Sequence, residues 1–479
     1  MIEKQNSSSL SRVNKAAGTG QLWKAVNKLT GKQGDSEADL PLTVEEMNSF
    51  YAAASTDSGY LPPILKDTAS PNVTTCHEAD IFSILDSLKP TAEGLDRLPA
   101  WFLRLLAPVC SGWIASLFNH SLNTSTIPEQ WRVARIRPVA KTKTPAGPGD
   151  FRPISVVPVL SRVLERIVVS RYIYPALAEP PINKLIQDQF AFRPTGSTSA
   201  ALIDLLQKTT DLLRVNEFVA IISVDFTKAF DRIRHHALSQ KYLLLDLPDH
   251  IHNWVMDYFK GRGHSTMAAA IYSLIAWINA SIIQGSGIGP PSYVVAASDL
   301  HARHIQNALT KFADDTYLLV GSSSIETLKD EYENIKQWAE KNNMKIHPSK
   351  TKELIVTRAR SRTARVPSKP LIDGAERVTS LRVLGVLLDS RLTMSDHVSQ
   401  VLSACSSSIF ALRLLRNHGL RSDQLHLVAR ATTIVSILCA TPAWWGFAGV
   451  GDRQRLERLV ARLRRMGYLP MDFPSVETR

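Results

Sequence analysis

Two adjacent aspartates, Asp314 and Asp315, lie within the apolar stretch KFADDTYLLV of residues 311–320. The residues on both sides of the pair predict buried β-structure. Two unit charges about 4 Å apart repel by roughly 4 kcal/mol at an effective dielectric constant near 20. A chain tolerates such a pair if the carboxyls are protonated, if they lie at an open turn, or if a cation neutralises them.

A third aspartate follows another apolar run. Residues 218–226, FVAIISVDF, predict a central strand that delivers Asp225 where the chain leaves the core. Carboxylate oxygens are the ligands that Mg²⁺ prefers, and two such ions about 3.5 to 4 Å apart promote phosphoryl transfer. The sequence therefore suggests that Asp225 meets Asp314 in space. The alternative is that these aspartates are unrelated turn or cap residues.

The composition favours a folded, nucleic-acid-binding protein. The chain has 479 residues, and its 44% hydrophobic content is sufficient for two or three packed domains. Lys and Arg number 56 against 44 Asp and Glu, and the resulting charge of +12 favours a polyanionic partner, although it also serves solubility. The four cysteines form no CxxC pair, which indicates reduced core residues in an intracellular protein and argues against a zinc site.

Neither end of the chain indicates secretion or membrane insertion. The N-terminus lacks an apolar stretch of signal-peptide length. Residues 431–450 form an apolar run long enough to span a bilayer by count. Because Pro442, Gly446 and Gly449 interrupt its second half, we interpret this run as protein core and expect no membrane partner.

The order of elements predicts an α+β fold with chemistry at strand ends. Residues 1–45 look like a linker or a truncated edge, and Thr43 and Glu46 have capping-box spacing at the start of the first helix. Helical patterns continue to residue 130. Residues 133–160 then predict a basic hairpin around a Pro/Gly/Lys-rich loop at 141–149.

Together these segments resemble the reverse transcriptase of non-LTR (LINE-type, CR1/Jockey-like) retrotransposons. The motifs occur in the family's order over roughly residues 80–470. They are LKPTAEGLDRLPAWFLRLL, DFRPISVVPVLSRVLERIV, QDQFAFRPTGSTSAALIDLL, VDFTKAFDRIRHHAL, QGSGIGPPSY, FADDTYLLV, WAEKNNMKIHPSKTKE and LRVLGVLLDSRLTMSDHV, followed by a thumb-like helical tail. Several ordered segments are a more specific signal than any single motif.

The resemblance implies a right-hand polymerase, an α+β fold with fingers, a palm built on an antiparallel sheet, and a helical thumb. The expected divisions are a linker or truncated edge at 1–45, a helical extension at 46–130, fingers at 131–215, palm at 216–400 and a partial thumb at 401–479. The implied activity is two-metal nucleotidyl transfer from a deoxynucleoside triphosphate to a DNA 3′-hydroxyl on an RNA template. The primer is a DNA end or nicked target DNA.

The resemblance also assigns roles to individual positions. Asp225 and Asp314 match the ligands of two Mg²⁺ ions, or of Mn²⁺ as a substitute, with Asp315 as a weaker acid and the Phe226 carbonyl as a further ligand. Nucleotide-binding roles fall on Lys141, Arg152, Phe230, Gln284 and Gly285, with Phe230 as the bulky residue that excludes a ribose 2′-hydroxyl. Lys350 matches a proton donor to pyrophosphate, and Arg193 matches a residue that contacts the template or supports the fingers.

Three positions depart from the family pattern: Ala191 replaces a usual glycine, Pro291 a usual apolar residue, and His347 a usual asparagine. They keep open a catalytically decayed, RNA-binding remnant as an alternative. Another templated polymerase with a double-Asp palm is a second alternative. The RNA copied, the target site, a missing endonuclease or partner subunit and the oligomeric state stay undetermined. The family implies a cytoplasmic ribonucleoprotein that reaches the nucleus.

Overall fold

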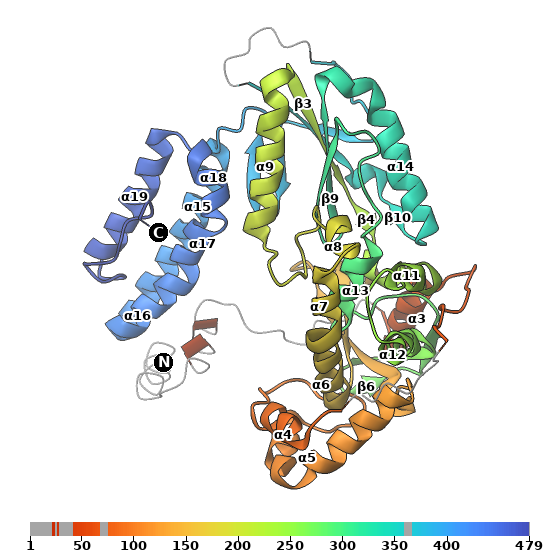
Figure 1. The fold of residues 1–479 in the computed structure, drawn as a ribbon. Coiled ribbons are helices and arrows are strands. Elements are labelled where there is room, and N and C mark those ends of the chain that lie inside the picture. The colour runs from red at the N-terminus through yellow and green to blue at the C-terminus, as the bar shows by residue number, and fades with distance from the viewer. Residues whose placement is uncertain (1–21, 24–25, 28–41, 68–74, 359–365, 479) are drawn as a thin grey trace.

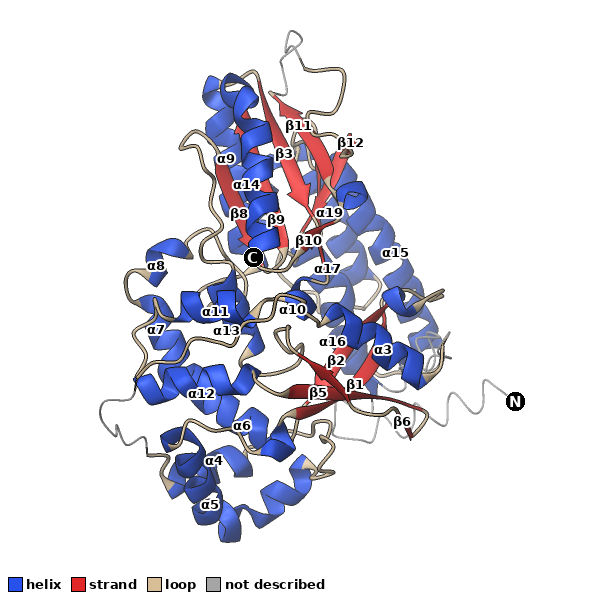
Figure 2. Cartoon of the chain, turned by 90° about the vertical axis from the view of Figure 1, so that its right-hand side faces the viewer, coloured by secondary structure: helices blue, strands red, loops and turns tan. Residues whose placement is uncertain are grey.

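A five-stranded sheet in the order β12-β11-β3-β9-β8 forms the centre of the upper part of the molecule (Figures 1 and 2). The computed structural model describes residues 22–23, 26–27, 42–67, 75–358 and 366–478. The strands of this sheet are β3 (Phe218–Val224), β8 (Ala308–Phe312), β9 (Asp315–Gly321), β11 (Lys352–Thr357) and β12 (Glu376–Val378). β3 pairs antiparallel with both β9 and β11, so it is the central strand, as predicted.

Both faces of this sheet are buried, which explains the continuous apolar run of β3. Val219 and Ile221 point into a core shared with helix α9 (Thr198–Val215) and the C-terminal helices. Ala220, Ile222 and Val224 point into the opposite core. Helix α14 (Leu328–Lys341) contributes to that second core. Because successive strand residues alternate between faces, every residue of β3 needs to be apolar or small.

A second sheet in the lower half has the order β2-β1-β5-β6, with β7 also paired to β5 (Figure 2). Its strands are β1 (Val133–Ala140), β2 (Phe151–Val156), β5 (Arg262–Ala268), β6 (Ile271–Tyr272) and β7 (Ala276–Ile278). The predicted basic hairpin is β1 and β2, which pair antiparallel. β5 adds to β1 in parallel, so part of the range predicted as palm joins the sheet of the hairpin that was predicted to belong to the fingers.

Two further strand pairs complete the β-structure. They are β4 (Phe226–Thr227) with β10 (Lys345–Ile346), and β13 (Ser380–Val383) with β14 (Val386–Asp389).

Helices surround the two sheets. The N-terminal helices are α3 (Val44–Ala54), α4 (Glu78–Asp86) and α5 (Ala100–Asn123). The capping box of Thr43 and Glu46 is confirmed at the start of α3. The predicted linker of residues 1–45 falls mostly outside the described residues. The middle of the chain supplies α6 (Val159–Val168), α7 (Tyr174–Ala178), α8 (Ile182–Leu185), α10 (Ala229–Arg232), α11 (His235–Tyr242), α12 (Asp249–Phe259) and α13 (Gly289–Ala296).

A helical bundle at the C-terminal end packs beside α9 (Figure 1). Its helices are α15 (Ser395–Asn417), α16 (Ser422–Ala429), α17 (Val435–Leu438), α18 (Thr441–Trp444) and α19 (Val450–Arg465). Ile437 and Trp444, from the apolar run of residues 431–450, are fully buried in this bundle. By length and composition alone, three described helical segments are apolar enough to cross a membrane: Ala100–Asn123, Ser395–Asn417 and Ser422–Phe447.

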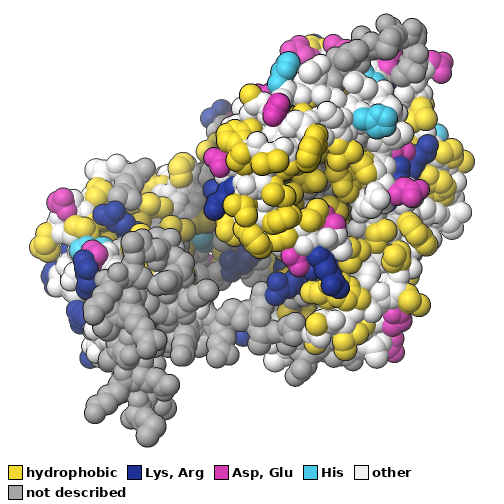
Figure 3. All heavy atoms as spheres, turned by 90° about the horizontal axis from the view of Figure 1, so that it is seen from below, with side chains coloured by type: hydrophobic (Ala, Val, Ile, Leu, Met, Phe, Trp, Pro, Cys, Tyr) yellow, Lys and Arg dark blue, Asp and Glu magenta, His cyan; other side chains and the backbone are white. Residues whose placement is uncertain are grey.

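An apolar stripe is exposed along α5, on the lower end of the molecule (Figure 3). Large side chains recur at every fourth position and share one face of the helix. They are Trp101, Leu105, Val109, Trp113 and Leu117.

Candidate active site

The two adjacent aspartates lie at the tip of a tight hairpin, which we call the acid hairpin (β8, β9 and their turn). Phe312 pairs with Asp315, so Ala313 and Asp314 form a two-residue turn. Ala313 has a φ of 55°, in the left-handed region. Two-residue hairpin turns usually belong to the types whose backbone twist matches that of the flanking strands. These types have a positive φ at the first turn residue. The predicted turn is therefore present, and it separates Asp314 from the start of β9.

The sheet register brings Asp225 to the acid hairpin. Val224 of β3 is opposite Thr316 of β9 in antiparallel pairing. The next position along each strand consequently sets Asp225 beside Asp315. Three aspartates from segments distant in the sequence thus meet at one end of the central sheet.

The three carboxyls influence one another electrostatically. Loss of surrounding water, followed by the charges of Asp314 and Asp225, raises the pKa of Asp315 to about 6, although part of its side chain is exposed. Burial and the charge of Asp225 also raise the pKa of Asp314, while Arg152 opposes that rise. Raised carboxyl pKa values mean that the site favours added positive charge.

The protein side chains alone do not enclose a metal ion. Within the described part of the chain, no group of three or more His, Cys, Asp or Glu side chains is arranged to hold one. Mg²⁺ usually keeps several waters and binds through one or two carboxylates together with substrate phosphates. The incompletely enclosed carboxyls of Asp225 and Asp314 therefore fit a Mg²⁺ ion that takes its remaining ligands from solvent and nucleotide.

The chain around Asp225 is fixed through its backbone. The His347 N–H donates to the Asp225 carbonyl at 2.9 Å. Lys350 Nζ lies 3.9 Å from Asp225 Oδ2, with both side chains exposed. Phe226 pairs with Ile346 across β4 and β10, and its ring is buried. Lys350 is thus beside an acid of the site, whereas its role as a proton donor and that of the Phe226 carbonyl as a ligand stay predictions.

Phe230 lies in an aromatic group next to the acids. Its ring stacks on Tyr293 with 4.5 Å between centroids, and Phe192 meets it edge-on at 6.0 Å. Burial and then the charges of Asp314 and Asp315 raise the pKa of Tyr293. Tyr293 therefore connects Phe230 to the acid hairpin. Tyr293 ends the QGSGIGPPSY motif, but no local sequence pattern indicates its contact with Phe230.

The two basic residues that were predicted to bind the nucleotide lie near different acids. Arg152 is exposed on β2, and its charge lowers the pKa of Asp314. Lys141 is exposed after β1, where its Nζ donates to the Gly149 carbonyl at 2.9 Å. The charge of Lys141 acts on Asp231 rather than on the acid hairpin. The structure therefore brings Arg152 to the three aspartates, whereas Lys141 stays at the edge of the group.

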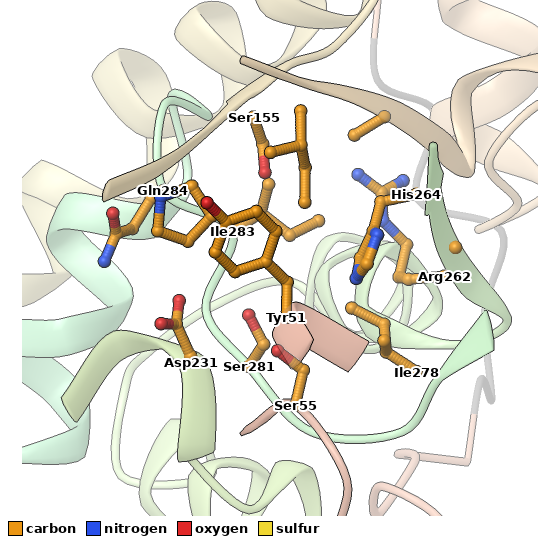
Figure 4. Close-up of a pocket in the computed structure, with 14 residues that line it drawn as sticks. Tyr51, Ser55, Ser155, Asp231, Arg262, His264, Ile278, Ser281, Ile283 and Gln284 are labelled. Atoms are coloured by element: carbon orange, nitrogen blue, oxygen red, sulfur yellow. The ribbon is translucent and has the colours of Figure 1, made fainter. Parts of the chain in front are cut away.

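The loop of Gln284 and Gly285 packs directly against β2. The Ser155 N–H donates to the Gln284 carbonyl at 2.9 Å. Gly285 has a φ of 102°, and a Cβ there would lie 2.4 Å from the Ser155 carbonyl oxygen. Only glycine fits such an approach. Figure 4 shows that Gln284 also lines a pocket, which Tyr51 and Asp231 share.

Asp231 is a buried acid that the sequence analysis missed. It is 9% exposed and lines the same pocket as Gln284. Burial raises its pKa to about 6, and the nearby Lys228 and Lys141 limit the rise. The available signal was its position in VDFTKAFDRI, six residues after Asp225.

Arg193 braces its own loop. Its guanidinium donates to the Ile186 carbonyl at 2.6 Å and to the Gln189 carbonyl at 3.0 Å. Of its two predicted roles, these contacts favour support of the fingers, and a template contact stays a prediction. Gln189 itself was missed, although it is fully buried beside the acid hairpin.

The three departures from the family pattern fit their local structure. Ala191 is buried and has no positive φ that would require glycine. Pro291 lies in the first turn of α13, where a missing N–H breaks no helical hydrogen bond. His347 contacts Asp225 through its main chain, so this contact does not depend on its side chain.

Comparison with known proteins gives a family match and longer relatives. Residues 139–388, more than half of the chain, match the family model described as reverse transcriptase (RNA-dependent DNA polymerase). The chain is 27% identical over 392 residues to the probable RNA-directed DNA polymerase from transposon BS of Drosophila melanogaster, covering 78% of this chain and 42% of that protein. It is 29% identical over 331 residues to the RNA-directed DNA polymerase from mobile element jockey of the same species, covering 66% and 35%. The chain thus spans less than half the length of these relatives.

Among solved structures, the telomerase of Candida tropicalis in complex with a fragment of telomeric RNA matches with a TM-score of 0.43 and 13% identity, covering 71% of this chain and 56% of that one. The apo telomerase of the same species matches with a TM-score of 0.41 and 12% identity, covering 76% and 67%.

Proposed function

Because the chain belongs to the reverse transcriptase (RNA-dependent DNA polymerase) family, we propose that it extends a DNA 3′ end on an RNA template. The primer 3′-hydroxyl attacks the α-phosphate of a deoxynucleoside triphosphate, and pyrophosphate leaves. The observation that carries this proposal is the meeting of Asp225, Asp314 and Asp315 at one end of the central sheet. Its templates and primers are the RNA and DNA partners that the sequence implies.

In this mechanism Asp225 and Asp314 would hold two Mg²⁺ ions, or Mn²⁺ as a substitute, with Asp315 adjacent and the Phe226 carbonyl as a further oxygen donor. When bound, such ions would supply a lower pKa for the attacking hydroxyl and neutralisation of charge on the leaving pyrophosphate. The raised pKa values of Asp314 and Asp315 support this assignment, because a cation relieves the repulsion that causes part of them.

Other side chains of this chain bind and orient the nucleotide. Arg152 faces the acids and supplies a planar, permanently charged group for triphosphate oxygens. Lys141 approaches from the loop after β1, and Gln284 and Gly285 contact the nucleotide from the loop before α13. Phe230, held against Tyr293, excludes a 2′-hydroxyl by its volume. Lys350 gives a proton to the departing pyrophosphate.

The same proposal assigns parts of the hand. The fingers comprise residues 131–215 together with β5, β6 and β7, because these strands share the sheet of β1 and β2. The palm is the central sheet with α14. Residues 401–479 form a partial thumb beside α9.

A primer-extension assay tests the function. Purified protein is given poly(rA) with an oligo(dT) primer, deoxythymidine triphosphate and Mg²⁺. We expect incorporation by the wild type and by Asp330→Ala, which removes an exposed aspartate of α14, and none by Asp225→Ala. Equal incorporation by the wild type and Asp225→Ala would refute the mechanism.

The second candidate is an RNA-binding remnant whose chemistry has decayed. The net charge of +12 supports it, because a basic protein retains salt-sensitive affinity for RNA without any catalysis. In the same preparation it predicts RNA binding that weakens steeply with salt, and no incorporation by any variant.

A further inference from the structure

The fully buried side-chain amide of Gln189 holds the turn of the acid hairpin. Its Oε1 accepts the Ala313 N–H at 3.0 Å and the Ala191 N–H at 3.1 Å. Its Nε2 donates to the Ala313 carbonyl at 3.3 Å. Both main-chain polar groups of Ala313, the residue with positive φ directly before Asp314, are therefore bound by one side chain.

The segment around Gln189 also behaves as an extra strand on the outer edge of β8. The Lys311 N–H donates to the Asp188 carbonyl at 2.7 Å, and the Phe190 N–H donates to the Lys311 carbonyl at 2.9 Å. Gln189 and Lys311 form a parallel bridge. β8 is the last strand of the central sheet, so residues 188–190 cover an edge that otherwise lacks a partner.

A buried ion pair fixes the same edge. The ammonium group of Lys311, whose side chain is inaccessible to solvent, lies 3.0 Å from Asp188 Oδ1. It also donates to the carbonyls of Ala297 at 2.8 Å and Leu300 at 2.6 Å. The ammonium group thus has two carbonyl acceptors and one carboxylate beside it. β8 is thus held in two ways. Its edge is hydrogen-bonded to residues 188–190, and its Lys311 side chain is bound by buried groups.

We propose that Gln189 is a positioning residue, which fixes the turn so that Asp314 keeps its separation from Asp225. This inference rests on the proposed function of the three acids. Metal–ligand distances vary by only about 0.2 Å, whereas a two-residue turn with a free tip moves more than that. Residues 188–190 thereby couple the fingers to the acid site.

The opposite end of β9 offers a matched control. Asn216 is another buried side-chain amide. Its Oδ1 accepts the Ser323 N–H at 2.8 Å, and its Nδ2 donates to the Leu212 carbonyl at 2.9 Å. It therefore holds the chain just beyond Gly321, at the end of β9 away from the acids.

The test compares Gln189→Met, which keeps the side-chain volume but not the amide, with Asn216→Leu and the wild type in the full chain. Hydrogen–deuterium exchange is followed in peptides that cover residues 308–318 and 319–327. We expect Gln189→Met to speed exchange in the first peptide by about 10-fold, the effect of one hydrogen-bonded contact worth about 1.4 kcal/mol. Asn216→Leu should act on the second peptide instead.

Two further readouts separate positioning from simple loss of stability. Mn²⁺ binding, measured by electron paramagnetic resonance, should weaken about 10-fold in Gln189→Met and stay unchanged in Asn216→Leu. In primer extension, Gln189→Met should lower kcat and raise the Mg²⁺ concentration for half-maximal rate, with KM for the nucleotide unchanged. In Gln189→Glu, burial and the neighbouring acids should keep the new carboxyl protonated, so it retains both an acceptor and a donor and its effects should be smaller.

The inference is overturned if Gln189→Met matches Asn216→Leu in Mn²⁺ affinity and in exchange of residues 308–318. It is also overturned if both Gln189 variants fail to fold, because the amide is then a folding element. Failure of the proposed function has a different signature, which is a wild type without incorporation. In that case the exchange and Mn²⁺ comparison still decides whether Gln189 positions the turn.

Discussion

The acid hairpin and the loop between β1 and β2 are held in opposite ways. In the acid hairpin, buried groups bind the turn, the edge strand and the side chain of Lys311. In the loop, Lys141 is exposed and its ammonium donates to the Gly149 carbonyl, while Arg152 at the start of β2 is likewise exposed. Cation ligands need a fixed geometry before any substrate arrives. Groups that bind a flexible triphosphate can settle after it enters.

This contrast leads to different consequences for mutation. Changes in the acid hairpin should act on the rate of the chemical step, because they alter groups that are already in place. Changes in the loop should act on nucleotide affinity, because they alter groups that engage on binding.

The largest effect is expected at Asp314. Asp314→Asn keeps the size of the side chain but removes a charge at the half-buried turn, and we expect kcat to fall by about 1,000-fold or more, as losing several kcal/mol of metal-based stabilisation implies. Asp315→Asn, at the exposed neighbour, should cost about 10-fold. Single-turnover primer extension measures both. A larger effect at Asp315 would reverse our assignment of the two acids.

Arg152→Ala should have an intermediate effect. Losing a charged hydrogen bond of about 1.5 to 3 kcal/mol predicts a 10- to 100-fold lower kcat/KM, carried mainly by KM for the nucleotide. Arg152→Lys should recover part of the loss. Lys141→Ala should cost less, since Lys141 acts on Asp231. Steady-state kinetics at varied nucleotide concentration measures kcat and KM separately. A fall in kcat with an unchanged KM would contradict the contrast between the two regions.

Phe230→Ala should change selectivity more than rate. Removing the ring that stacks on Tyr293 opens space at the sugar, and steric discrimination of about 1 to 3 kcal/mol predicts that ribonucleotide use rises by about 10-fold or more. Incorporation of ribo- and deoxyribonucleotides is compared in parallel. Phe192→Ala, which removes the ring that meets Phe230 edge-on, is the control and should leave this ratio unchanged. Unchanged selectivity in Phe230→Ala would reject the gate.

The smallest effect on catalysis is expected at Asp231. Its substitution should instead change the stability of the fold, to an extent that depends on pH. Because the folded pKa of about 6 is above the usual value of 3.8, ionisation destabilises the native state as pH rises between them. Asp231→Asn should therefore raise the free energy of unfolding by about 1 to 3 kcal/mol above pH 6, and the gain should disappear below pH 4. Urea denaturation at pH 8 and pH 4 measures it. A gain that persists at pH 4 would exclude this cause.

Local sequence patterns were sufficient for the elements that carry the acids. The apolar run before Asp225 predicted a central strand, and the residues around Asp314 and Asp315 predicted a strand pair with a turn. These predictions succeed because burial on both faces imposes a continuous apolar sequence. The spacing of Thr43 and Glu46 likewise predicted the start of α3.

Long-range pairings were not accessible in the same way. Gln189 contacts Ala313 across 124 positions, and no local pattern indicates that a glutamine is buried there. The parallel pairing of β5 with β1 similarly depends on chain segments far apart. Because these contacts arise only when the tertiary structure assembles, the sequence motifs identified the acids but not the groups that position them.

The strand order of the central sheet also constrains how the chain folds during synthesis. β3 is made first, yet its two neighbours β9 and β11 end only at Gly321 and Thr357. A nascent chain shorter than this carries an apolar strand with both edges open, which favours association with other chains. The first edge of β3 can be paired only after 97 further residues and the second only after 133. At usual rates of translation this takes at least several seconds, and chaperones or rapid collapse must protect β3 in that interval.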